Sequence, residues 1–128
     1  MMTAGKYYVG DLCYVMSDEE WEQVCKITIV GHKCIEGEFN LPDGRRFAMY
    51  NTKWGDGLYK DQNNHQYGVD SGTIGCIKVE DITSDKYGFG FDDLGSVYEF
   101  QTDFVTSKHE GVLQFGRIHI DTCLLYTS

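Results

Sequence analysis

A chain of 128 residues is long enough for one domain that buries its own hydrophobic core. Hydrophobic residues make up 41% and aromatic residues 14% of the chain, a composition that excludes an intrinsically disordered protein. The formal net charge of −9 argues against binding to duplex DNA or RNA, because a negative surface repels the phosphate backbone that supplies most nucleic-acid affinity.

The sequence predicts a cytoplasmic protein that does not enter a membrane. No apolar run approaches the roughly 20 residues of a membrane span, and the N-terminal residues lack the pattern of a secretion signal. The five cysteines are odd in number and form no CxxC pair, which is typical of reduced thiols. A metal site from Cys25, His32 and Cys34 would match no zinc spacing, so we expect no metal and no cofactor.

The first regular element that the chain predicts is a short helix over residues 17–26. Ser17 and Glu20 have the spacing of a capping box, in which each side chain binds the other residue's backbone N–H. Acidic residues in the first turn also interact favourably with the helix dipole. The apolar face of this segment is narrow, so the helix should pack against a sheet.

The rest of the chain predicts strands and turns. The clearest hairpin joins residues 38–41 to residues 46–52 through Leu41-Pro42-Asp43-Gly44, where Pro fixes φ and Gly accepts positive φ. In its second strand Phe47 and Met49 alternate with Ala48 and Tyr50, so we expect one apolar face toward the core and one mixed face. Other predicted strands are 7–9, 12–16, 27–30, 66–69, 73–79, 97–101, 104–107 and 112–120.

These elements predict a mainly β fold, an antiparallel many-stranded sheet or barrel-like domain with one short N-terminal helix. Strands do not alternate with long helices, which argues against the dinucleotide-binding α/β fold. We expect a single β-rich domain over residues 1–122. Residues 123–128 read as a tail that resembles a translated sequencing adapter, and it is left out of the functional prediction.

Residues 52–75 are rich in Gly, Asp, Tyr and Ser, a composition typical of functional loops. Gly55-Asp56-Gly57 can turn its backbone amides toward an anion, or can form an ordinary hairpin turn. Asp70 and Ser71 can exchange hydrogen bonds with a ligand hydroxyl, or can form an Asx turn.

Arg45, Arg46 and Lys53 lie in a stretch of nine residues without an acid, which makes it the best local anion site in the sequence. Arg46, Tyr50 and Thr52 alternate onto one strand face, where they would offer a guanidinium, an aromatic ring and a hydroxyl to a phosphorylated ligand. The alternative is a solvated outer face.

Three segments carry a resemblance: KYYVGDLCYVM, GDGLYKD and YGVDSGTIG resemble a set of small phage and environmental proteins, over most of residues 6–122. Through GDG-x-Y and a VD-[ST]-G-like turn the chain is also similar to a bacterial domain of unassigned function. Neither family has an established activity, so no catalytic residue is transferred. The resemblance implies a phage accessory protein in the host cytoplasm.

Small phage proteins of this kind resemble inhibitors of host defence that sequester nucleotide immune signals, such as cyclic ADP-ribose derivatives or cyclic dinucleotides. By that analogy we expect a homo-oligomer that binds a small anionic, nucleotide-like ligand. The aromatic residues expected to stack on the bases are Tyr50, Trp54, Tyr59 and Tyr67.

Two alternatives remain open. A phosphodiesterase would use His65 or His109 as general base and Arg46 to stabilise the transition state, but the sequence offers no paired base, so we lean against an enzyme. An inhibitor of a host protein would use an acidic surface such as Asp18, Glu19, Glu20 and Glu22 of the predicted helix.

Overall fold

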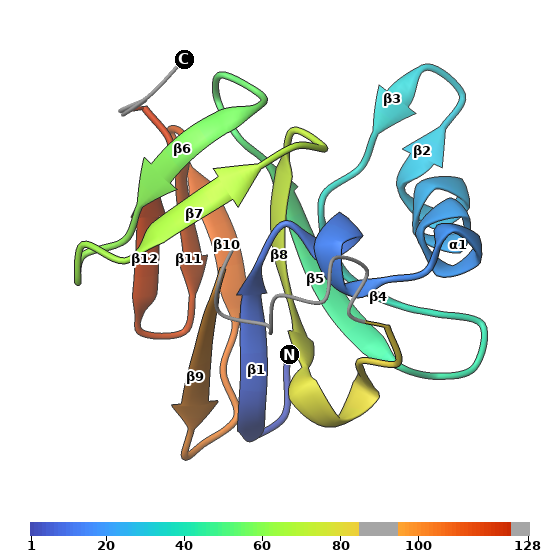
Figure 1. Cartoon of the computed structure of the whole chain (residues 1–128), viewed down its shortest axis with the longest axis horizontal. Helices are drawn as coiled ribbons and strands as arrows, with labels where there is room; N and C mark the ends of the chain where they lie inside the picture. Colours follow the sequence, from blue (N-terminus) through green and yellow to red (C-terminus); the bar gives the residue numbers. More distant parts are fainter. Residues whose placement is uncertain (85–94, 124–128) are drawn as a thin grey trace.

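The computed structural model describes residues 1–84 and 95–123, and its main element is a five-stranded antiparallel sheet (Figure 1). The strand order is β4-β5-β8-β1-β9. The strands are β1 (Gly5–Gly10), β4 (Gly37–Asn40), β5 (Arg46–Asn51), β8 (Thr73–Lys78) and β9 (Ser96–Phe100). Since β4 and β9 are free edges within the described residues, this sheet is open rather than a closed barrel. The predicted mainly β fold with an antiparallel many-stranded sheet is confirmed.

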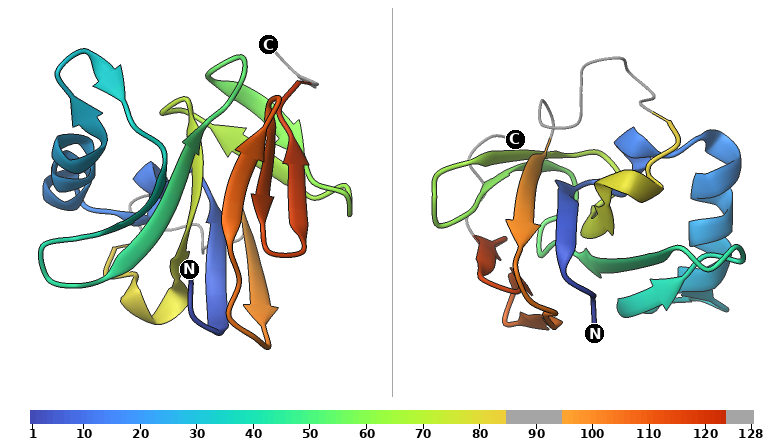
Figure 2. Two further views of the ribbon diagram at one scale, coloured as in Figure 1. Left: turned by 180° about the vertical axis from the view of Figure 1, so that it is seen from behind. Right: turned by 90° about the horizontal axis from the view of Figure 1, so that it is seen from below.

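Smaller sheets and helices cover both faces of the central sheet (Figure 2). On one side lie a three-stranded sheet in the order β10-β11-β12 and the hairpin β6-β7. On the other side lie α1, the short 3-10 helix η1 and the hairpin β2-β3. Their bounds are η1 (Leu12–Val15), α1 (Asp18–Thr28), β2 (Ile29–Val30), β3 (Lys33–Cys34), β6 (Gly57–Lys60), β7 (Gln66–Val69), β10 (Thr106–His109), β11 (Val112–Phe115) and β12 (Ile118–Asp121), and a second 3-10 helix, η2 (Val79–Asp81), follows β8.

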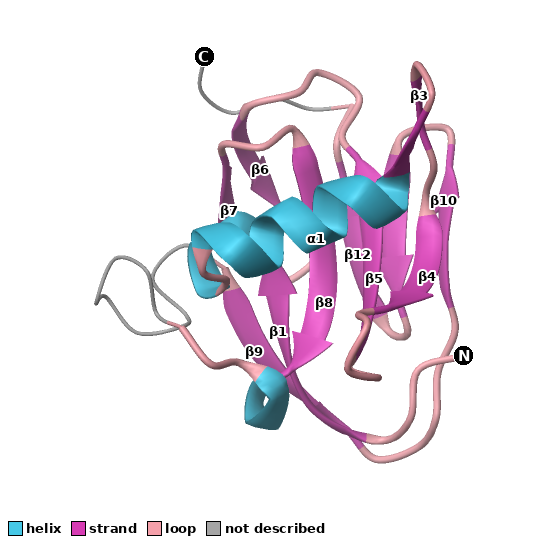
Figure 3. Ribbon diagram, turned by 90° about the vertical axis from the view of Figure 1, so that its right-hand side faces the viewer, coloured by secondary structure: helices cyan, strands magenta, loops and turns pink. Residues whose placement is uncertain are grey.

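The helix α1 begins where the sequence predicts. Ser17 is its N-cap, its side chain accepts the Glu20 amide, and the Glu20 carboxylate accepts the Ser17 amide, so the capping box is complete. The helix crosses the central sheet (Figure 3) and buries Val24 against it. Within the described residues no helix combines the length and apolar character that crossing a membrane requires.

The strand assignment of residues 12–16 is wrong, because Leu12 to Val15 form η1. The apolar run has strand-like composition, but Asp11 directly before it accepts the Cys13 amide at 3.1 Å and starts a helical turn. The predicted strand 112–120 is two strands, separated by a turn in which Gly116 has φ of 59°. The strands β3 and β6 were not predicted, because both are short and lie in loop-like sequence.

The central sheet is buried on both faces, which corrects the expectation of one apolar and one mixed face for β5. Phe47 and Met49 pack in the core beneath α1 and η1. Ala48 and Tyr50 point the other way, into a second core beneath β10-β11-β12 and β6-β7. The prediction of a mixed face failed because the Tyr50 ring is buried in this core, while its hydroxyl hydrogen-bonds to Thr106 Oγ1 at 2.7 Å.

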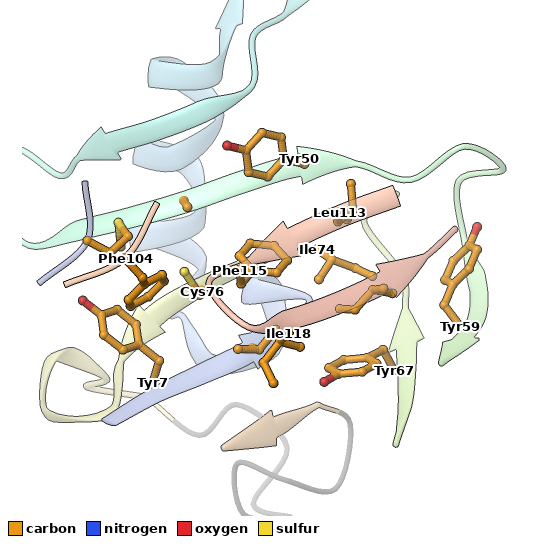
Figure 4. Packing of buried hydrophobic residues seen from close by; sticks show 14 of the residues in the cluster. Tyr7, Tyr50, Tyr59, Tyr67, Ile74, Cys76, Phe104, Leu113, Phe115 and Ile118 are labelled. Atoms are coloured by element: carbon orange, nitrogen blue, oxygen red, sulfur yellow. The ribbon is translucent and has the colours of Figure 1, made fainter. Parts of the chain in front are cut away.

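The second core is rich in aromatic side chains (Figure 4). Tyr7, Tyr59, Tyr67 and Phe115 are fully buried there, together with aliphatic residues of β8, β11 and β12. This core holds the hairpin β6-β7 against β12, and it therefore fixes the position of the loops on either side of that hairpin.

Candidate functional site

The two loops that the sequence singles out lie side by side at one end of β5 and β8. The Thr52 amide donates to the Gly72 carbonyl at 3.0 Å. A methyl group placed on Gly72 would come within 3.8 Å of the Gly55 Cα atom. The loop after β5 and the turn between β7 and β8 therefore form one unit.

A buried carboxylate, Asp11, organises the turn between β7 and β8. Its Oδ2 atom accepts the amides of Asp70 and Ser71, both at 2.7 Å, and its Oδ1 atom accepts the Ser71 hydroxyl at 2.7 Å. The Ser71 hydroxyl also contacts Thr73 Oγ1 at 2.7 Å. The Ser71 hydroxyl, one of the predicted ligand groups, is therefore engaged with the protein itself, whereas Asp70 takes part through its backbone amide and is exposed. Sequence reasoning missed Asp11, although an Asp before an apolar run is a capping signal.

The predicted cations do not form one site. Arg45 lies at the β4-β5 turn, where its guanidinium contacts Glu20 at 2.6 Å and Asp43 at 2.8 Å. Burial alone would lower the pKa of Arg45, but these two carboxylates outweigh it and raise that pKa. Arg46 contacts Glu38 at 3.0 Å. Lys53 follows the far end of β5, and at about 3.3 Å per residue it lies on the order of 20 Å from Arg46.

Three of the four predicted aromatic residues are core residues. Tyr59 and Tyr67 are fully buried and Tyr50 is 7% exposed. The Tyr59 hydroxyl donates to the Gly55 carbonyl at 2.9 Å, and Thr52 Oγ1 donates to the same carbonyl at 2.6 Å. These bonds shape the loop that contains Gly55 and Asp56, and Gly57 begins β6 directly after it.

Trp54 is the exception among these aromatic residues, because 56% of it is exposed. Its indole N–H donates to the Cys123 carbonyl at 2.9 Å, and the Lys53 ammonium lies 5.4 Å from its ring centroid. Lys53 and Trp54 thus present a cation and an aromatic ring to solvent.

Asp61 is the centre of a second buried polar cluster, beside β6-β7. Its carboxylate accepts the hydroxyls of Tyr67 at 2.7 Å and Tyr98 at 2.8 Å, and the amides of Asn63 and His65. Burial would raise the pKa of Asp61, but these donors outweigh it and lower that pKa, whereas burial raises the pKa of Tyr67. The Asp61 carboxylate accepts four hydrogen bonds from the protein, so it has a structural rather than a reactive role.

An apolar cleft of about 110 Å³ lies between the central sheet and the unit formed by α1 and β2-β3. Trp21 and Cys25 of α1 and Ile29 and Ile35 of the hairpin region form its apolar wall, and Met49 contributes from β5. Burial raises the pKa of the Cys25 thiol. The remaining lining residues are Thr28, Cys34, Glu36, Tyr50, Asn51, Ser71 and Thr73.

An open hollow of about 630 Å³ shares the lining residue Asn51 with this cleft. Lys53, Lys108 and Glu110 line the hollow, together with Asn51, Gly111 and Cys123, the first residue of the tail that was left out of the functional prediction. The structure therefore places one predicted cation, Lys53, next to a second cation that the sequence did not associate with it. Of the predicted site residues, Tyr50 and Ser71 line the cleft and Lys53 the hollow.

Glu36 connects the cleft to the hollow. Its Oε2 atom accepts the Asn51 amide at 2.7 Å and also binds the Lys108 ammonium. Asn51, Lys108 and Glu36 come from β5, β10 and the segment before β4, so no local sequence pattern joins them.

Comparisons of this chain with protein-family models, with curated proteins and with solved structures found no match. The site is therefore interpreted from its own geometry.

Proposed function

We propose that this protein binds a small anionic ligand and does not catalyse a reaction on it. The ligand's anionic group would lie in the hollow beside Lys53, and its ring or apolar part would enter the cleft. The observation that carries this proposal is that Asn51 lines both an apolar cleft and a hollow with two lysines. Ligand sites commonly combine an apolar surface with a few polar groups that fix orientation.

The dimensions of the two spaces support this proposal. A dry apolar cavity of about 150 Å³ accommodates benzene. The cleft, at about 110 Å³ and partly open, accommodates a group of similar or smaller size, so a purine base would enter it with one edge and leave the rest in its opening. The hollow is several times larger and open to solvent, so a hydrated phosphate or a ribose phosphate fits it.

The net charge of −9 disfavours anions at long range, but screening limits that repulsion. Within a Debye length of about 8 Å, the charges that line the hollow decide the binding free energy. Lys53 contributes positive charge there, since within the described residues its ammonium contacts the Trp54 ring and pairs with no carboxylate. The Glu110 carboxylate also lines the hollow, but its side chain is highly exposed, so solvent and salt screen its charge.

A nucleotide belongs to this ligand class and agrees with the resemblance to phage proteins. Under that more specific proposal the protein sequesters a nucleotide immune signal, such as a cyclic ADP-ribose derivative or a cyclic dinucleotide, as a phage accessory protein in the host cytoplasm. A homo-oligomer would supply further contacts to so large a ligand. Both statements remain predictions.

The phosphodiesterase alternative has less support. His65 Nε2 is engaged with the Gly95 carbonyl, and Arg46 is paired with Glu38. His109 is highly exposed beside Glu110. None of these groups combines a free base with a free cation at a cleft.

The two tryptophans allow a direct binding test. Trp21 lines the cleft and Trp54 is the other tryptophan, so Trp54→Phe makes Trp21 the sole reporter. Titration with adenosine monophosphate should change Trp21 emission, and adenosine should bind more weakly because it lacks the phosphate. No change with any nucleotide, at concentrations up to tens of millimolar, would contradict the proposal and favour an acidic protein that binds a host protein.

Variants at the cations locate the anionic group. Lys53→Ala should weaken binding of adenosine monophosphate about fivefold, the equivalent of about 1 kcal/mol for one exposed ion pair. Arg46→Ala is the matched control, because its guanidinium is already neutralised by Glu38, and affinity should change less than twofold. Intact nucleotide recovered after heat denaturation indicates sequestration, and altered nucleotide indicates an enzyme.

A further inference from the structure

The contacts of Glu36 point to a role in ligand selection. The Glu36 side chain is 26% exposed and the Lys108 side chain is 30% exposed. One carboxylate oxygen of Glu36 accepts hydrogen bonds from two groups, the backbone N–H of Asn51 and the Lys108 ammonium. Both donors belong to residues that line the hollow.

A backbone N–H together with a lysine ammonium is a typical set of donors for an anion. Here the protein's own carboxylate occupies that set. A ligand anion that enters the hollow would therefore meet Lys53 directly, and would gain Lys108 and the Asn51 amide when Glu36 moves away.

We propose that Glu36 is a specificity-determining residue that occupies the anion-binding donors of this site until the anionic group of a ligand displaces it. This inference rests on the proposed function, because it concerns the same hollow. Glu36 lies in the short connection between β3 and β4, and β3 itself is a two-residue strand whose residues are exposed.

Charge decides which anions displace Glu36. A ligand carboxylate carries the same single charge as Glu36 and gains little by replacing it. A phosphate monoester carries a charge of about −1.5 to −2 at neutral pH and offers three acceptor oxygens. Such a group can contact Lys53 and Lys108 together, so the site should favour phosphate over carboxylate.

The test compares Glu36→Gln with Glu22→Gln. Glu36→Gln keeps the size of the side chain and removes its charge, which frees Lys108 for a ligand. Glu22 lies on the exposed face of α1 beside Lys26, at 3.5 Å, so Glu22→Gln makes the same change in net charge away from the site. The probes are inorganic phosphate, adenosine monophosphate and acetate, measured by calorimetry on the full chain.

We expect Glu36→Gln to bind adenosine monophosphate and phosphate at least fivefold more tightly than the unmodified chain. It should also bind acetate more tightly, which reduces the preference for phosphate. Glu22→Gln should change each affinity less than twofold. Glu36→Asp, which withdraws the carboxylate by one methylene group, should give an intermediate gain and serves as a second variant if Glu36→Gln folds poorly.

The inference is overturned if neither Glu36 variant binds phosphate or adenosine monophosphate more tightly than the unmodified chain, including the case in which none of them binds. The proposed function fails separately, if the unmodified chain binds no nucleotide. Binding by Glu36→Gln alone would support the inference, while the proposed function of the unmodified chain would fail for the nucleotides tested.

Discussion

Replacing Asp11 tests whether this buried carboxylate holds the turn between β7 and β8 in place. Asp11 is fully buried, and two backbone amides, of Asp70 and Ser71, donate to it at 2.7 Å. Leaving a buried donor without an acceptor costs about 1–3 kcal/mol. Removal of a buried charge offsets part of that cost. We therefore expect Asp11→Ala to lower the free energy of unfolding by about 2–4 kcal/mol, out of the 5–15 kcal/mol typical of a domain.

The assay is urea denaturation followed by tryptophan emission, with the change read from the midpoint at an unchanged m value. Asp70→Ala is the matched control, because Asp70 is exposed and binds Asp11 through its backbone amide, so its loss should stay within about 0.5 kcal/mol. Asp11→Asn should fall between the two, since one oxygen is retained. A loss below about 1 kcal/mol for Asp11→Ala would refute the reasoning.

Three further predictions concern other buried groups. Burial would raise the pKa of Glu38, but hydrogen bonds from the Met1 amino group, Thr106 and Arg46 outweigh burial and lower this pKa from 4.5 to about 2. The ionised Glu38 carboxylate therefore contributes its full stabilisation above about pH 4.5, and this stabilisation is lost as the pH falls toward 2. Glu38→Gln should therefore flatten the acid side of the stability curve measured by thermal unfolding, and an unchanged slope would argue against this role. Tyr67→Phe removes a buried hydroxyl that contacts Asp61 at 2.7 Å and Ser96 at 2.6 Å, and it should lower the free energy of unfolding by about 1–2 kcal/mol in urea titrations. Cys34 is exposed whereas Cys76 is fully buried with a raised thiol pKa, so an aromatic disulfide reagent should modify Cys34 first and Cys76 only on unfolding. Peptide mapping that finds rapid labelling of Cys76 in the folded protein would contradict this order.

Local chemistry was enough to predict some elements of the fold. The capping box at Ser17 and the Pro-Asp-Gly turn before Arg45 depend on residues within a few positions of each other, and both are present: the Gly44 amide donates to the Leu41 carbonyl at 2.9 Å and Gly44 has φ of 97°. The choice between helix and strand for residues 12–16 failed, because the outcome depends on Asp11 and on burial beneath α1. The burial of both faces of β5 could also not be predicted from the sequence, since it depends on how the sheet β10-β11-β12 packs against the central sheet.

The residues of the candidate site were harder to predict from the sequence, because the predicted arginines pair with carboxylates that other elements of the fold supply. Arg45 and Arg46 lie in a stretch without acids, but their carboxylate partners come from α1 and β4. Sequence neighbours report the charge of a segment, whereas the charge of a site depends on every element that packs against it. Lys108 shows the converse, because it reaches the hollow from a strand more than fifty residues away from Lys53 in the sequence.

The excess of acids makes the state of each cation informative. The chain has 20 acidic residues and 11 lysines and arginines, so a cation can readily find a carboxylate. Lys108 forms an ion pair with the Glu36 carboxylate, at the position where a ligand anion would bind, whereas the Lys53 ammonium contacts the Trp54 ring. A hollow with one lysine neutralised and its neighbour facing solvent is consistent with the proposed reversible anion site, because the internal carboxylate limits repulsion between the lysines.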